Sequence, residues 1–375
     1  MRRRKYGPGL RTANQIRSVR EITSTTSSAK AKACVQSTGA KTCVVSAIVI
    51  SYNTAQLTRS CLIALQQSID LESAEVIVVD NNSKDESVAM IRMEFPYVRV
   101  IENKRNLGFG AANNLAMAAA TGEFFLLVNS DAVVGEGAVE RMIEMMQEQP
   151  KAGAVVPQLL NADGTLQRSV WRYPSPLRIW ADAFWLPKLF PENAVLGDFR
   201  SWAHDAKQKV EWAIGACLMV RRSVFEEIGG FDERFFMYAE ETDWQKCMTA
   251  AGWEVWLTPD AKVIHLGGGS GKGYATVTEQ FYHSQDLYLL KHYGWAGLIA
   301  ARLAIFIGSF ARAFIWLFCR ASIDGSVEDY NKNRRHRCWL GWRAASRWKS
   351  IFRAREHWTD DSGRQTTRKA RCFTL

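Results

Sequence analysis

The chain has 375 residues, of which 47% are hydrophobic and 23% are charged, and this is typical of a globular protein with about two domains and a sizeable core. Its formal net charge is +10, but the surplus lies at the ends: residues 1–42 hold ten Lys/Arg against one acid, and residues 321–375 hold thirteen against six. The middle, residues 43–320, holds 25 basic and 31 acidic residues. An acidic middle argues against nucleic acid as a partner.

The basic N-terminal segment, residues 1–42, lacks the apolar stretch that a secretory signal needs. It also lacks hydrophobic periodicity, so we predict a flexible lead. Basic ends favour contact with anionic lipid, and a solvated tail is the alternative for residues 1–42. The eight cysteines form no C-x-x-C pair and most lie in apolar stretches, which favours reduced thiols in a cytoplasmic protein over a disulfide scaffold.

Four apolar, β-branched runs alternate with helical segments between residues 43 and 149. This alternation is typical of the βαβ units of a doubly wound, Rossmann-like sheet. A continuous run such as CVVSAIVIS predicts a strand that is buried on both faces. The predicted strands are 43–51, 75–80, 98–102 and 123–129; the predicted helices are 54–68, a helix capped by 81–83 that ends near 95, an Ala-rich helix that ends at 120, and 137–149.

Polar clusters follow three of these strands, and ligands of such sheets bind beyond the carboxyl ends of the strands. We therefore predict one shared site at this edge. The first strand is followed by S-Y-N, and neither G-x-G-x-x-G nor G-x-x-x-x-G-K-[ST] occurs in the chain. This argues against a dinucleotide-binding dehydrogenase, a P-loop and a nucleotidyltransferase with a Gly/Arg-rich phosphate loop. The clusters are Ser51–Tyr52–Asn53, Asp80–Asn81–Asn82 and Asn129–Ser130–Asp131.

The regular alternation ends after Pro157. Residues 158–210 carry Trp, Pro and Arg in irregular order, which predicts long loops with short elements. Ordered structure is expected again from residue 212. We predict an ordered segment at 212–221, helices at 222–228 and 240–251, short strands at 253–257 and 262–265, and a Gly-rich loop at 267–273.

Residues 294–319 are apolar and long enough to cross a bilayer. Arg302 and Arg312 interrupt the run, and a charge at the centre of a spanning helix is costly. A helix in the membrane interface fits this pattern, with Trp295, Trp316 and Arg320 as anchors, and the basic, Trp-rich residues 332–358 favour it further. The alternative is a buried amphipathic helix of a soluble fold.

Several acids and one histidine are candidates for chemistry. Asp131 ends a hydrophobic strand, where a carboxylate suits a hard divalent cation that also binds phosphate. Glu240, Glu241 and Asp243 open a predicted helix; the helix dipole favours acids there, although three exceed what capping requires. His265 ends a short strand and is a candidate metal ligand. Each signal alone has an ordinary structural explanation.

Taken in order, these stretches resemble the GT-A fold glycosyltransferases of family 2, and in particular their rhamnosyltransferase-like branch. The resemblance covers about residues 44–270, and GGFDERFF followed by Y-x-E is its most specific part. The matching stretches are VSAIVISYN, EVIVVDNNSKDES, NKRNLGFGAANN, FFLLVNSD, GACLMVRRSVFEEIGGFDERFFMYAEETDW and VIHLGGGS.

The resemblance implies a role for each matching position. A divalent cation, Mg²⁺ or Mn²⁺, is expected at Asp131 and His265, and the catalytic base at Glu241 or Asp243. The donor nucleotide-sugar is expected to contact Ser51, Tyr52, Asn53, Asp80, Asn82, Asn106, Gly108, Phe109, Asn114 and Asn129.

Two departures from the family pattern bear on these roles. The metal motif reads N-S-D and not D-x-D, and Glu241 stands where the family usually has Asp. A Glu is one methylene longer and can still deprotonate a hydroxyl, so the choice of base between Glu241 and Asp243 stays open. Attack by the activated hydroxyl on the anomeric carbon is a single displacement and inverts configuration.

The expected protein is thus an α/β, GT-A enzyme with a mixed sheet and C-terminal amphipathic, membrane-associated helices. Its expected activity is inverting transfer of a deoxysugar, rhamnose first, from a dTDP- or UDP-sugar to a glycan or lipid-linked acceptor of the cell envelope. We expect a cytoplasmic protein, peripheral at the inner face of the cell membrane. The expected regions are 1–42, a transferase domain at 43–275 and a membrane-associating region at 276–375. A catalytically inactive nucleotide-sugar-binding protein is the alternative.

Overall fold

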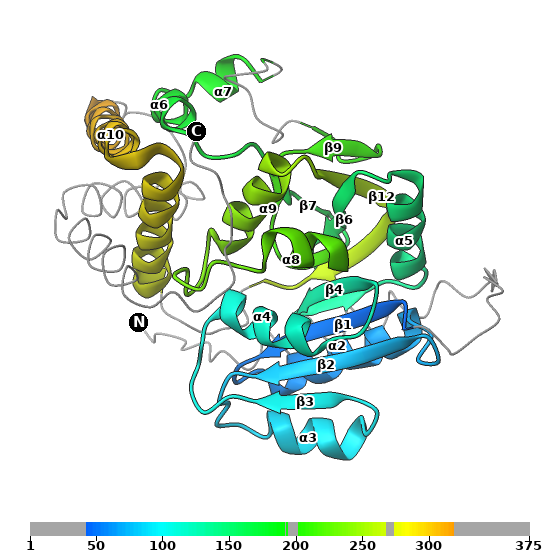
Figure 1. The fold of residues 1–375 in the computed structure, drawn as a ribbon. Coiled ribbons are helices and arrows are strands. Elements are labelled where there is room, and N and C mark those ends of the chain that lie inside the picture. Colours follow the sequence, from blue (N-terminus) through cyan, green and yellow to red (C-terminus); the bar gives the residue numbers. More distant parts are fainter. Residues whose placement is uncertain (1–42, 192, 194–201, 268–273, 319–375) are drawn as a thin grey trace.

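The computed structural model describes residues 43–191, 193, 202–267 and 274–318, and a ten-stranded mixed sheet forms its centre (Figure 1). The neighbouring strands of the sheet run in the order β3-β2-β1-β4-β11-β6-β12-β5, with β7 paired to β6 and β9 paired to β12. The predictions for residues 1–42, for most of the Gly-rich loop and for residues 319–375 lie outside the described residues.

The first half of the sheet is parallel. Strands β1 (Val45–Ser51), β2 (Ala74–Asp80), β3 (Arg99–Glu102) and β4 (Phe124–Asn129) pair side by side in one direction. The interiors of β1, β2 and β4 are buried, as their β-branched and aromatic runs predict. The four strands expected from the sequence are all present.

Helices cover both faces of the sheet. One core contains apolar residues of α2 (Ala55–Ser68), α3 (Ser87–Glu94) and α5 (Ala138–Glu148). A second core, on the other face, contains residues of α4 (Phe109–Ala119), α8 (Arg222–Ile228) and α9 (Glu240–Ala250). This two-sided cover is the doubly wound arrangement that the sequence predicts.

The second half of the sheet is mixed. Strand β11 (Cys217–Arg221) lies antiparallel between β4 and β6 (Ala152–Leu160), and β12 (Glu254–His265) is parallel to β6 and antiparallel to β5 (Ala132–Val134). The short elements are β7 (Leu166–Gln167), β8 (Val170–Trp171), α6 (Pro176–Ala183), α7 (Leu186–Leu189), β9 (Gln208–Val210) and β10 (Trp212–Ala213).

Two predicted boundaries were wrong. The strands expected at 253–257 and 262–265 are one strand, β12, whose register on β6 shifts between Thr258 and Lys262. Residues 81–83 do not cap α3, which begins at Ser87. Ser83 instead donates its backbone N–H to Asp80 (2.8 Å), and Asp85 accepts from the backbone of Ser87 (3.2 Å). The Asp80 side chain therefore holds a turn that precedes the helix.

A long helix, α10 (Tyr274–Phe318), follows the sheet, and it bends at Gly294 (φ 63°, ψ −169°). Its first part packs Leu287 and Tyr288 in a core with Phe235, while its second part lies beside α6 (Figure 1). Among the described residues, the stretch Glu279–Ala311 has the length and apolar composition of a membrane span. Arg302 is buried and pairs with Asp286 across the bend.

The cysteines of the described part are free thiols. Cys61 and Cys217 are buried, and Cys43 and Cys247 are partly exposed. Burial raises the pKa of the Cys217 thiol to about 12, so this thiol stays protonated and unreactive at neutral pH.

Candidate active site

The three polar clusters meet at one edge of the sheet. In the parallel register Ser51 lies opposite Asp80, and Ile50 lies opposite Asn129. The hydroxyl of Thr54 bonds to that of Ser130 (3.2 Å), which ties the loop after β1 to the loop after β4. The structure therefore brings together the residues that follow β1, β2 and β4.

Asp80, the last residue of β2, has two carboxylate oxygens in different surroundings. It is 3% exposed, and its Oδ2 accepts the backbone N–H of Ser83 (2.8 Å). Its Oδ1 is buried and has no hydrogen-bond partner in the part of the chain that the structure describes. A buried carboxylate oxygen without a partner is costly, so a donor group of a ligand, such as a ribose hydroxyl or a base N–H, fits this position.

The loops after β1 and β2 hold each other in place. Asn53 and Asn82 both have left-handed backbones (φ 55° and 66°), a conformation that asparagine tolerates well. Asn53 donates its backbone N–H to Ser83 (2.9 Å) and accepts that of Lys84 (2.7 Å). Tyr52, which lies between the end of β1 and Asn53 in the chain, is partly exposed.

The start of α4 lies against the loop that precedes α9. Asn106 accepts the backbone N–H of Gly108 (2.9 Å), and the Phe109 N–H donates to the Phe236 carbonyl (3.0 Å). Gly108 has φ 86°, and a Cβ there would lie 2.1 Å from the Phe236 oxygen, so only glycine fits. Asn106, Gly108 and Phe109 are thus held where these two segments meet.

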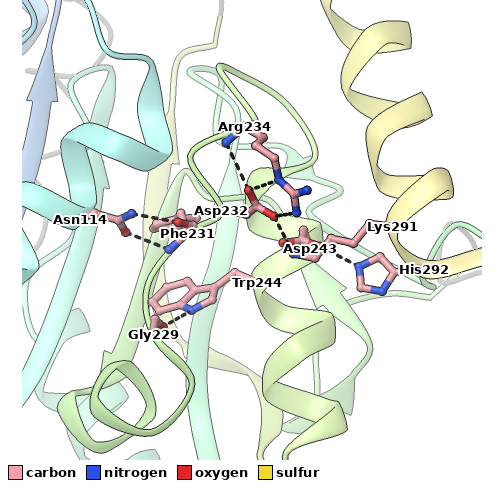
Figure 2. A network of polar contacts seen from close by, with 9 residues as sticks. All are labelled: Asn114, Gly229, Phe231, Asp232, Arg234, Asp243, Trp244, Lys291 and His292. Carbon is pink, nitrogen blue, oxygen red and sulfur yellow. Dashed lines mark hydrogen bonds and ion pairs between the residues drawn. The ribbon is translucent and has the colours of Figure 1, made fainter. Parts of the chain in front are cut away.

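Asn114 contacts the loop between α8 and α9. Its side chain donates to the carbonyl of Phe231 (2.8 Å) and accepts the N–H of the same residue (2.8 Å), as Figure 2 shows. It also donates to Glu233 (3.1 Å). These contacts engage both ends of the amide in fixing the GGFDER segment to α4.

Asp131 and His265 lie side by side because β5 and β12 are antiparallel neighbours. His265 pairs in register with Ala132, and the Leu266 N–H donates to the Asp131 carbonyl (3.0 Å). The Nε2 of His265 lies 3.4 Å from Oδ1 of Asp131, and both side chains are largely buried.

Gln167, which sequence reasoning did not single out, sets the tautomer of this histidine. Its amide nitrogen donates to the carbonyl of His265 (3.1 Å) and to Asn161 (3.0 Å), so its oxygen faces Nδ1 of His265 (2.7 Å). Nδ1 must therefore carry a proton. In a neutral ring Nε2 then presents a lone pair to the Asp131 carboxylate, and two facing acceptors fit a cation between them.

The side chains of Asp131 and His265 could together bind a divalent cation. One carboxylate and one imidazole are suitable ligands, and such ions commonly complete their coordination with phosphate oxygens and water. Among the described residues, no group of three or more His, Cys, Asp or Glu side chains could hold a metal ion. These two side chains therefore offer an incomplete set to which a diphosphate could add.

The acids at the start of α9 are buried next to these segments. Tyr238 and Ala239, directly before α9, have left-handed backbones (φ 68° and 65°). A Cβ on Gly110 would lie 3.7 Å from Cβ of Glu240, and one on Gly215 would lie 3.6 Å from Cβ of Glu241. One carboxylate oxygen of each is buried without a partner in the described part of the chain.

Burial raises the pKa of both carboxyl groups, and the charge of Glu241 raises that of Glu240 further. Hydrogen bonds from backbone groups, that of Gly215 among them, oppose the rise at Glu241. The next residue, Ala216, accepts the backbone N–H of Asn129 (2.9 Å). Glu241 is therefore joined through two adjacent residues to the end of β4, which leads to Asp131.

Asp243 has a different environment. It is 1% exposed, and its two oxygens bond to Lys291 (2.7 Å) and His292 (2.7 Å) of α10 (Figure 2). Lys291 also bonds to Asp232 (2.8 Å), which pairs with Arg234. Burial opposes ionisation of Asp232, but the Arg234 hydrogen bond and the Lys291 charge hold its pKa far below its usual range.

Comparison with known proteins places the chain in a family. The family model described as Glycosyl transferase family 2 matches residues 46–229. An N-acetylglucosaminyl-diphospho-decaprenol L-rhamnosyltransferase of Mycobacterium tuberculosis is 32% identical over 234 residues, which are 59% of this chain and 76% of the relative. The O-antigen biosynthesis protein RfbC of Myxococcus xanthus is 28% identical over 223 residues, 57% of this chain and 16% of that protein.

A solved structure agrees at the level of the fold. The mannosyltransferase PcManGT from Pyrobaculum calidifontis, in complex with GDP-Man and Mn²⁺, aligns with a TM-score of 0.52 at 17% identity, covering 94% of this chain and 95% of that one. The fold is that of the GT-A glycosyltransferases. The chain belongs to glycosyl transferase family 2, in its rhamnosyltransferase-like branch. The expected family and fold class are thus confirmed, and the protein is a glycosyltransferase with a nucleotide-sugar donor.

Proposed function

We propose that this chain is an inverting, metal-dependent glycosyltransferase that moves a deoxyhexose, rhamnose first, from a dTDP-sugar to a hydroxyl of a lipid-linked or cell-surface glycan. UDP-sugars are the second donor class. The Mycobacterium tuberculosis relative, named for L-rhamnosyl transfer to N-acetylglucosaminyl-diphospho-decaprenol, supports this sugar and acceptor. The observation that carries the reaction type is the buried carboxyl of Glu241, connected through Gly215 and Ala216 to the strand end that leads to Asp131.

Asp131 and His265 are the residues that would hold the divalent cation. When bound there, the cation neutralises charge that develops on the leaving diphosphate. The bond between Gln167 and Nδ1 of His265 supports this assignment, because it leaves Nε2 free to coordinate. The Mn²⁺ in the Pyrobaculum calidifontis mannosyltransferase is consistent with the same ion here.

Glu241 is the proposed catalytic base. Its carboxylate takes the proton of the acceptor hydroxyl while the hydroxyl oxygen bonds to the anomeric carbon. The bond from that carbon to the diphosphate breaks in the same step, so configuration inverts. A pKa raised by burial makes the carboxylate a stronger base. Asp243 is a positioning residue in this mechanism, because Lys291 and His292 occupy both of its oxygens.

The donor is proposed to bind across the three strand ends. The unpartnered Oδ1 of Asp80 supports a contact with the nucleoside. The remaining proposed nucleoside contacts are Ser51, Tyr52, Asn53 and Asn82, and Asn106, Gly108, Phe109 and Asn129 line the diphosphate-sugar side. Asn114 is proposed to support this pocket from behind, because Phe231 holds its amide.

The protein is proposed to work at the cytoplasmic face of the cell membrane. A lipid-linked acceptor of the relative and the apolar helix α10 support this location. The region that associates with the membrane is proposed to begin at the bend at Gly294 and not at residue 276, because Leu287 to Leu290 pack in a core with Phe235 of the transferase domain.

The test is a donor panel on the full-length protein with Mg²⁺ or Mn²⁺ and a GlcNAc-diphospho-lipid acceptor. We expect release of dTDP from dTDP-rhamnose, and NMR of the product is expected to show inversion at the anomeric carbon. Glu241→Gln is expected to lower kcat about 10²–10⁴-fold with donor affinity unchanged. Asp131→Ala is expected to abolish metal-dependent donor binding as well as turnover.

Two results would oppose the proposal in different ways. If no donor releases its nucleotide but titration calorimetry still detects donor binding, the chain is an inactive nucleotide-sugar-binding protein. If Glu241→Gln retains full turnover while Asp243→Asn loses it with its fold intact, the base is Asp243.

A further inference from the structure

An exposed apolar face covers one side of the molecule. Of the fifteen exposed large hydrophobic side chains in the described residues, ten lie on α6 and α7, each taken with the residue after it, and on the second part of α10. These segments lie together at one end of the molecule (Figure 1). The α10 members are Trp295, Ile299, Leu303, Phe306, Ile307 and Phe310, each between 40% and 63% exposed. Their spacing places them on one stripe of the helix.

The second part of α10 turns its small residues inward. Leu298, Ala301 and Ala304 are buried, and a Cβ on Gly308 would lie only 2.6 Å from Cβ of Ala183 in α6. Arg302 also points inward, to Asp286. The helix therefore buries Leu298 together with small and polar groups, and exposes six large apolar side chains. A helix on a water-facing surface would expose mainly polar side chains.

The α6–α7 segment extends the same face. Leu177, Phe184, Leu189 and Phe190 are between 41% and 67% exposed, and Trp180 stacks on Phe184 (ring centroids 5.8 Å apart). Lys188, next to Leu189, is exposed as well. Aromatic and aliphatic side chains beside a cation match the headgroup boundary of a bilayer. We call the ten exposed side chains, six on α10 together with Leu177, Phe184, Leu189 and Phe190, the apolar face.

The charge of the chain indicates which partner covers the apolar face. The residues that follow α10 are strongly basic, with thirteen Lys/Arg against six acids in residues 321–375. A second copy of the chain would bring the same surplus of positive charge, which disfavours a dimer. A membrane with anionic lipids instead attracts the segment and takes up the apolar side chains.

We propose that the apolar face docks onto an anionic lipid bilayer, with the second part of α10 lying in the plane of the interface. Arg302 stays within the protein, paired with Asp286, so it does not enter the lipid. The inference deepens the proposed function, since a lipid-linked acceptor would be met at the same bilayer. Its evidence, however, is the face itself and not the activity.

The experiment measures binding of the full-length protein to vesicles by flotation. The vesicles contain either phosphatidylcholine alone or a mixture with phosphatidylglycerol. The test variant combines Ile299→Asn, Phe306→Asn and Phe310→Asn. The matched control combines Ile63→Asn, Met93→Asn and Leu115→Asn, three exposed apolar residues on α2, α3 and α4. Circular dichroism and size-exclusion chromatography with light scattering verify that each variant is folded and report its oligomeric state.

We expect the wild type and the control to bind phosphatidylglycerol vesicles, and the test variant to bind at least about tenfold more weakly, because three apolar side chains no longer enter the bilayer. The deficit should persist in high salt, where attraction by the basic segment is screened.

Three outcomes would overturn the proposal. Unchanged vesicle binding of the test variant would mean that the basic segment alone binds lipid. Conversion of a wild-type dimer to a monomer by the test variant would assign the face to a second copy. If residues 319–375 become sensitive to proteolysis in the variant while vesicle binding is unchanged, the apolar face is covered by residues 319–375 of the same chain. Turnover of a water-soluble acceptor is measured separately, so failure of the proposed function is distinguishable.

Discussion

At the scale of a single residue, the hydrogen bond from His265 to Gln167 is expected to determine how well His265 binds the cation. Gln167→Met removes the acceptor that fixes the Nδ1 proton, so the ring is free to adopt the other tautomer and to turn away from Asp131. We expect the affinity for Mn²⁺ in the presence of dTDP to fall about 10–100-fold, measured by electron paramagnetic resonance of free Mn²⁺.

Two further variants separate this role from general damage. Gln167→Glu keeps an acceptor toward Nδ1 and should retain more Mn²⁺ affinity than Gln167→Met. Gln67→Met, at an exposed position of α2, should bind Mn²⁺ like the wild type. Equal affinity in Gln167→Met and the wild type would remove Gln167 from the site.

Glu240 gives the stability of the protein a dependence on pH. Burial and the neighbouring Glu241 charge raise the pKa of Glu240 well above its usual value, so the folded state binds this proton more tightly than the unfolded chain does. The favourable contribution is complete below the unfolded pKa, about 4.3, and is lost as pH rises through the folded pKa. Ionised Glu240 therefore destabilises the fold at neutral pH.

Glu240→Gln removes this ionisation and should raise Tm near pH 7.5, at about 2–4 °C for each kcal/mol gained. The gain should shrink toward pH 4, where the wild-type carboxyl is already protonated. Glu144→Gln, on the exposed side of α5, is the control and should not reproduce the pH-dependent difference. A gain that is equal at pH 4 and pH 7.5 would contradict the assignment.

At the level of elements, α10 holds α9 in place through a buried ion pair between Lys291 and Asp243. Lys291 is 12% exposed and contacts both Asp232 and Asp243, so Lys291→Met leaves Asp243 with His292 alone. Removing one partner of a buried ion pair costs about 3–5 kcal/mol, and we expect a loss in this range by urea denaturation. Arg59→Met, which breaks the more exposed pair with Glu94, should cost about 0–1 kcal/mol.

The double variant Lys291→Met with Asp243→Asn tests the cause of that loss. It removes the uncompensated charge and should recover part of the stability. No recovery would mean that packing of the lysine stem, and not its charge, holds the two helices together.

The same elements show what a sequence can predict. Strands β1, β2 and β4 were predicted because their apolar runs are long and end in polar residues. The start of α3 was missed because the Asp80–Ser83 turn competes locally with a helix cap. The partners of Asp243 lie 48 and 49 residues away, and Gln167 lies 98 residues from His265. No local spacing encodes such pairs, so the tertiary fold alone reveals them.

On the scale of the whole molecule, Gly294 sets the direction of the apolar face relative to the active site. Its backbone (φ 63°, ψ −169°) is one that only glycine adopts readily, and the bend allows Arg302 to reach Asp286. Gly294→Ala therefore strains the bend, while Ser284, Lys291 and His292 of the first part of α10 keep their contacts with the transferase domain. The second part of α10 should then detach or change its direction.

We expect Gly294→Ala to turn over a water-soluble acceptor at the wild-type rate and a vesicle-embedded, lipid-linked acceptor several-fold more slowly, because a misdirected face no longer presents the active site to the bilayer. The control is Gly137→Ala, which strains a left-handed position (φ 72°) at the start of α5 with open space around it. Gly137→Ala should change the turnover of neither the water-soluble nor the vesicle-embedded acceptor. If Gly294→Ala slows both acceptors equally, the bend supports the transferase domain itself; if it slows neither, the direction of α10 is not what brings the active site to the lipid.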